Sequence, residues 1–109
     1  MQLLLDLVAG ALAANAIPHL VQGICGESHM TPFARRSSPV VNVAWGFANV
    51  LLALLVLQLA SRREVFALPA AGELTGPRLL AFLVGALLTA LALALFWSDP
   101  NARLPWHRD

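Results

Sequence analysis

Polar and aromatic side chains recur at helical spacing inside two otherwise apolar stretches of the chain. They are Asn15, His19 and Gln22 in the first stretch, and Asn42, Trp45 and Asn49 in the second. Residues three or four positions apart share one face of an α-helix. Side chains of these types can bond to one another between two helices, or they can bind a proton or a small polar solute.

His19 is the member of this set that could respond to pH, because an unperturbed imidazole titrates at about pH 6.5. Pro18 precedes it and removes a helical hydrogen bond, so a bend or a free carbonyl is expected beside Asn15. Interrupted helices with polar side chains at mid-depth form solute sites in transporters. The same side chains can equally serve only to join two helices, and both interpretations stay open.

Antiparallel packing of the first two stretches predicts three layers of polar contacts. These pair Asn15 with Asn49, His19 with Trp45, and Gln22 with Asn42. Gly46 lies on the same face and would allow the two backbones to approach closely. Such layers could satisfy the amide groups without water.

Asp6 lies nine residues before Asn15 and so points to roughly the opposite face of the first stretch. It is about one turn inside the N-terminal end. One interpretation is an ion pair with a nearby arginine, of which Arg62, Arg63 and Arg78 are the candidates. The other is a carboxylate that binds a proton or a cation, since ionisable groups inside a membrane are candidates for function.

Three apolar stretches must position these residues, and they cover approximately residues 2–25, 39–60 and 77–97. Each exceeds the length of about 20 residues that a helix needs to cross a bilayer core. Hydrophobic residues make up 59% of the 109-residue chain and charged residues only 12%. The sequence therefore predicts an all-α integral membrane protein of one domain (1–109), with three transmembrane helices, short loops and termini on opposite sides. Ser37 and Ser38 are expected to cap the second helix.

Several classes of function are disfavoured by composition. A net charge of +1 gives no basis for nucleic-acid binding. Cys25, Glu27 and His29 gather after the first stretch but lack the spacing of a metal site, so no metal or other cofactor is expected. No nucleophile elbow or phosphate loop is present, which makes an enzyme the less favoured class. The polar connection over residues 26–38 is interpreted as a loop that contacts lipid headgroups.

The distribution of arginines gives only a weak prediction of the orientation in the membrane. Arg62, Arg63 and Arg78 fall on one side of the predicted membrane, against Arg35, Arg36, Arg103 and Arg108 on the other. The positive-inside rule then favours an N-terminus outside, with dual orientation as the alternative. In length the chain is similar to the small multidrug resistance exporters. Those proteins have four spans and a glutamate in the middle of the first, so no residue is carried over from them.

Small residues on two ridges of the third stretch, around Gly85 and around Ala90, predict contacts with more than one neighbour. Three helices alone enclose little space, so a homo-oligomer or a larger membrane complex in the lipid bilayer is expected. The favoured function is an oligomeric or accessory subunit of a bacterial-type inner membrane with a buried polar seam. The alternative is a small transporter or channel for a proton or a small polar solute.

Overall fold

The computed structural model describes residues 1–62 and 74–107 and is mostly helical. Its three long helices are α1 (Gln2–Ile24), α2 (Pro39–Ser61) and α3 (Gly76–Trp97). Each is long and apolar enough to span a membrane. The three predicted helical stretches are confirmed, and no boundary differs by more than one residue. Arg63 and Arg108, used above to predict the orientation, lie outside the described residues.

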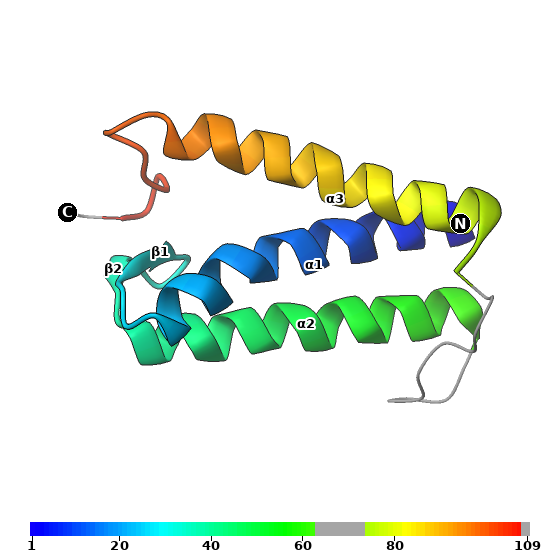
Figure 1. Cartoon of the computed structure of the whole chain (residues 1–109), viewed down its shortest axis with the longest axis horizontal. Coiled ribbons are helices and arrows are strands. Elements are labelled where there is room, and N and C mark those ends of the chain that lie inside the picture. Colours follow the sequence, from blue (N-terminus) through cyan, green and yellow to red (C-terminus); the bar gives the residue numbers. More distant parts are fainter. Residues whose placement is uncertain (63–73, 108–109) are drawn as a thin grey trace.

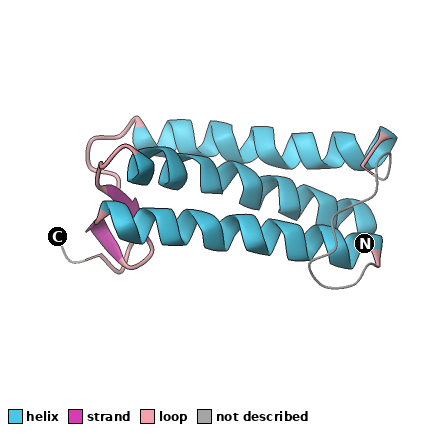
Figure 2. Ribbon diagram, turned by 60° about the horizontal axis from the view of Figure 1, so that its bottom comes forward, coloured by secondary structure: helices cyan, strands magenta, loops and turns pink. Residues whose placement is uncertain are grey.

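The helix α1 lies between α2 and α3 (Figure 1). It packs along both of them. The N-terminus lies at one end of the bundle, and the C-terminal segment lies at the other end beside the strands (Figures 1 and 2). α1 is therefore the element that holds the bundle together.

The start of α2 follows the expected capping pattern. The Ser38 hydroxyl accepts a hydrogen bond of 3.2 Å from the backbone N–H of Val41, and Pro39 occupies the first turn. The helix ends at Arg62, whose left-handed backbone (φ 55°) brings its N–H to carbonyl groups of the last turn. The predicted N-cap of the second helix is thus confirmed.

The connection between α1 and α2 contains a small antiparallel hairpin. Its strands are β1 (His29–Thr31) and β2 (Ala34–Ser37). The hydroxyl oxygens of Thr31 and Ser37 lie 2.6 Å apart and both residues are buried. The sequence analysis treated this segment as a headgroup-contacting loop, because its strands are too short to show an alternating pattern.

Small and polar side chains fill the interior, while large apolar side chains face outward. The largest fully buried side chains are those of Asn42, Asn49, Thr31 and Asp6. By contrast, Leu95 on α3 is 77% exposed. A water-soluble protein has the opposite distribution, with large apolar residues inside.

Candidate functional site

Asn42, fully buried in the first turn of α2, organises the hairpin end of the bundle. Its Nδ2 donates to three carbonyl oxygens, those of His29 (2.9 Å), Ser37 (3.1 Å) and Ser38 (3.1 Å). Because the amide nitrogen faces these acceptors, Oδ1 is the atom left for another partner. That partner is Nδ1 of His19 on α1, at 2.8 Å.

This contact assigns the tautomer of His19. An amide oxygen can only accept, so we place the imidazole proton on Nδ1. In the neutral ring Nε2 is then left as a hydrogen-bond acceptor. The His19 side chain is well buried, with 5% of the residue exposed.

The predicted layers are present only in part. Asn15 Nδ2 donates to Asn49 Oδ1 at 3.1 Å, as the antiparallel register predicted. Asn49 Nδ2 in turn donates to the Trp45 carbonyl at 2.9 Å. The structure does not place Gln22 among the hydrogen-bond partners of Asn42.

The reason is competition for one amide group. The nitrogen of Asn42 is taken by the hairpin and by the start of α2, so a single acceptor faces α1. His19, one turn before Gln22, takes it. Gln22 is left half-buried near the end of α1. The sequence pattern did not show that the hairpin would use the Asn42 amide.

A partly open cavity of about 220 Å³ lies beside His19 at the same end of the bundle. Residues from all three helices, the hairpin and the C-terminal segment line it, including His19, His29, Trp45, Phe96, Trp97 and Leu104. The ring centroids of His29 and Trp97 are 4.3 Å apart, and those of His19 and His29 are 5.2 Å apart. His19 and Trp45, which the antiparallel register predicts as neighbours, both line this cavity.

Two ring nitrogens of the lining residues are unusual. Nε2 of His29 and Nε1 of Trp45 are buried, and neither has a hydrogen-bond partner among the described residues. A buried polar atom without a partner costs about 1–3 kcal/mol. Burial lowers the pKa of His29 below its ordinary value, and the charge of a protonated His19 lowers it further. His29 is therefore neutral at neutral pH.

The C-terminal segment adds Leu104 to the lining of the cavity and is bonded to the hairpin, a contact that the sequence does not predict. The indole Nε1 of Trp106 donates to the Pro32 carbonyl at 2.7 Å. Nδ1 of His107 accepts from the backbone N–H of Leu104 at 3.3 Å, so Nε2 carries the proton and donates to the Thr31 carbonyl at 2.9 Å. The available signal was Trp106, an aromatic residue after the third helix, which resembles part of an ordinary interfacial belt.

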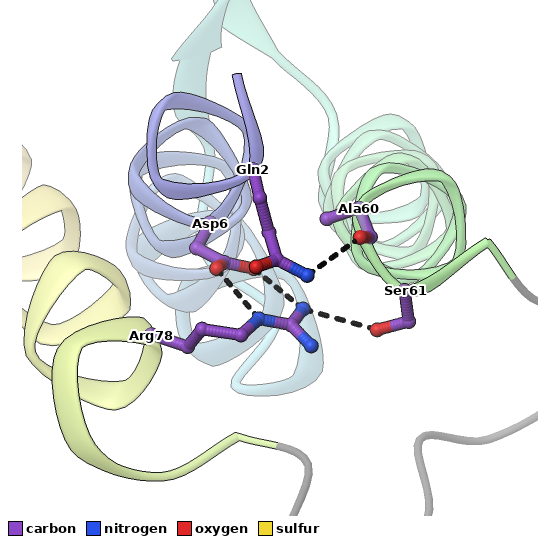
Figure 3. A network of polar contacts seen from close by, with 5 residues as sticks. All are labelled: Gln2, Asp6, Ala60, Ser61 and Arg78. Atoms are coloured by element: carbon purple, nitrogen blue, oxygen red, sulfur yellow. Dashed lines mark hydrogen bonds and ion pairs between the residues drawn. The ribbon is translucent and has the colours of Figure 1, made fainter.

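Asp6 lies at the opposite end of the bundle, where Figure 3 shows its contacts. It has no exposed surface, and Arg78 binds both of its carboxylate oxygens at 2.8 Å, through Nε and Nη2. Nη2 also donates to the Ser61 hydroxyl at 3.0 Å, and Gln2 donates to the Ala60 carbonyl at 3.0 Å. The predicted ion pair is present, and its cation is Arg78.

No protein-family model, curated protein or solved structure matches this chain.

Proposed function

We propose that this protein is a multi-pass subunit of a bacterial-type inner (plasma) membrane and works as a homo-oligomer or as an accessory part of a larger complex. Its three helices cross the bilayer and its termini lie on opposite sides. The outward-facing large apolar residues support this, since exposed apolar surface of this extent is unfavourable in water. The longest dimension of the molecule is 43 Å, and each helix is long enough to cross a hydrocarbon core of about 30 Å.

One observation carries the structural role. The polar side chains of the seam bond mainly to each other and to nearby backbone, as in the Asn15–Asn49 and His19–Asn42 pairs. Groups satisfied in this way fix which helix faces meet. The amides of Asn15, Asn42 and Asn49 are bonded without a solute, and the exception on this seam is Trp45 Nε1, which has no partner among the described residues. The seam therefore supports a chain whose polar residues specify its own packing.

The arrangement of α3 supports an assembly. Gly85 is its one buried residue among those described, and α1 is the helix on which it packs. Ala90 and Ala94, on the second ridge of small residues, are exposed. Ridges of small residues are typical of helix contacts within membranes. A second chain or a partner subunit on this ridge would give α3 a second neighbour.

Native mass spectrometry of the protein released from nanodiscs tests this proposal. We expect a defined oligomer or a reproducible complex with another membrane protein. As a matched pair, Ala94→Leu on the exposed ridge should reduce the assembly, whereas Val40→Leu on the outer face of α2 should not. A monomer at every concentration, without a co-purified partner, would contradict the proposal.

Transport of a proton or a small polar solute is the second candidate. The observation that favours it is the cavity beside His19, which extends to Asn15 near the middle of α1. If transport is the function, His19→Ala should abolish flux in proteoliposomes and leave the oligomer intact. A structural role predicts that the bundle itself loosens.

A further inference from the structure

We propose that the cavity at the hairpin end binds a small, neutral, planar molecule with a phenol-type hydroxyl, and that His19 Nε2 accepts the hydrogen bond of that hydroxyl. The occupant class is a phenol or a hydroquinone. This inference concerns binding alone and does not depend on whether the protein is a structural subunit or a transporter.

The size and walls of the cavity limit the occupant. An apolar protein cavity of about 150 Å³ can hold benzene. The volume here, about 220 Å³, therefore suits one substituted six-membered ring. Trp45, Phe96 and Trp97 supply aromatic walls, and flat rings stack against such side chains in offset or edge-to-face geometry.

Charge sets a second limit. None of the residues that line the cavity is Asp, Glu, Lys or Arg. A charged ligand would lose its hydration here without gaining a counter-ion. Among the described residues, no third histidine, cysteine or carboxylate joins His19 and His29 into a group that could hold a metal. The occupant is therefore a neutral organic molecule.

Hydrogen bonding sets the third limit. Because His19 donates through Nδ1 to Asn42, its Nε2 can only accept while the ring is neutral. The occupant must then carry a donor. The indole nitrogen of Trp45 is a donor without a partner, so it seeks an acceptor. A hydroxyl group supplies the donor that the imidazole needs, and its oxygen is also an acceptor of the kind that an indole N–H needs.

His29 completes the polar part of the site. Its Nε2 is buried without a partner among the described residues, and its ring packs on Trp97. In a hydroquinone the second hydroxyl lies across the ring from the first and offers a partner of either kind. A monophenol carries no second hydroxyl for this role.

The test compares p-cresol with two molecules of similar size, by titration into the full chain in nanodiscs. Toluene has the same ring without the hydroxyl, and 4-methylcyclohexanol has the hydroxyl without the flat ring. We expect saturable binding of one p-cresol per chain, about tenfold tighter than toluene, since one net hydrogen bond is worth about this factor. Binding should also be tighter than that of 4-methylcyclohexanol, which keeps the hydroxyl but cannot stack on the aromatic walls. The three indole N–H signals in an NMR spectrum give the location: that of Trp45 should shift.

Protein variants provide the matched controls. Phe96→Leu removes an aromatic wall and should weaken p-cresol binding at least about threefold. Phe47→Leu makes the same change on the exposed outer face of α2 and should leave binding unchanged. His19→Phe should remove the preference for p-cresol over toluene. Should that variant fail to fold, the Phe96 and Phe47 pair still decides the result.

Three outcomes would overturn the proposal. The first is uptake of p-cresol that rises without saturation, which reports partition into lipid. The second is equal affinity for p-cresol and toluene. The third is a cavity that keeps ordered water, with an unchanged Trp45 signal at saturating p-cresol.

Discussion

Asp6 is a carboxylate with no contact with solvent, and in the part of the chain that the structure describes one guanidinium compensates it. Both oxygens accept hydrogen bonds from Arg78 in the bidentate geometry that makes arginine–carboxylate pairs strong. Arg78 also bonds Ser61, so one side chain of α3 is joined to α1 and α2. Burying two charges is costly, and the geometry at this end is what offsets the cost.

Replacing Arg78 with methionine should destabilise the bundle by about 3 kcal/mol, because it leaves the Asp6 carboxylate buried without a counter-charge. The double variant Asp6→Leu/Arg78→Met removes both charges and should recover most of this loss. The free energy of unfolding is measured by circular dichroism in mixed micelles during titration with a denaturing detergent.

Arg103→Met is the control, because this arginine is exposed at the other end of the molecule. Its loss should change the free energy of unfolding by less than about 0.5 kcal/mol. If Arg78→Met costs no more than Arg103→Met, the ion pair does not hold the helices together. A double variant no more stable than the Arg78 single variant would show that packing, and not the unpaired charge, is what the single variant lost.

At the scale of elements, two glycines allow α1 and α3 to touch through their backbones. A Cβ at Gly10 would collide with the Phe82 carbonyl, and a Cβ at Gly85 would collide with the Leu7 carbonyl. The two contacts are reciprocal, since each glycine faces the backbone of the opposite helix. This is the close approach that small residues permit in membrane helix pairs.

Gly85→Ala should push α3 away from α1 and lower the free energy of unfolding by about 1–3 kcal/mol, the usual cost of overpacking. Gly10→Ala should act in the same way. The double variant should lose less free energy of unfolding than the sum of the two single losses, because helices already pushed apart by one methyl group have room for the second methyl group. Ala92→Val adds more volume on the exposed side of α3 and is the control. Additive costs for the two glycines would show that their contacts are independent.

Much of the element level could be predicted because long apolar runs and capping residues are local signals. The three helices, the Ser38 cap and the Asn15–Asn49 pair all follow from spacing along the chain. The cavity could not be predicted, because its walls come from segments far apart in sequence. Trp106 bonds Pro32 across 74 positions, and no periodic pattern records such a contact.

The choice of Arg78 among three candidate arginines shows the same limit. Spacing placed all three near the level of Asp6, and among the described residues the packing of α3 on α1 brings Arg78 to it. The hairpin gives a further example. Its strands are three and four residues long, too short for alternation, yet they decide the partner of Asn42 and so the tautomer of His19.

On the scale of the whole molecule, arginines lie at both ends of the bundle. Arg62 ends α2 and Arg78 lies in the first turn of α3, whereas Arg36 lies in β2 and Arg103 in the C-terminal segment. The end of α2 and the start of α3 lie near the N-terminus, and the other two elements lie at the opposite end (Figure 1). Cys25, the single cysteine, is exposed where α1 ends, at the hairpin. It is a native reporter of which side of a membrane this end faces.

Because the two ends carry nearly equal numbers of arginines, we expect a few substitutions to change the orientation of the protein in the membrane. In sealed inverted membrane vesicles, a membrane-impermeant maleimide should label most but not all of Cys25, since four arginines against three favour the hairpin end inside. Arg62→Gln should raise the labelled fraction towards completeness, and Arg36→Gln/Arg103→Gln should reverse the preference. Cys25→Ser supplies the background. Labelling that all of these substitutions leave unchanged would show that the arginine balance does not set the orientation.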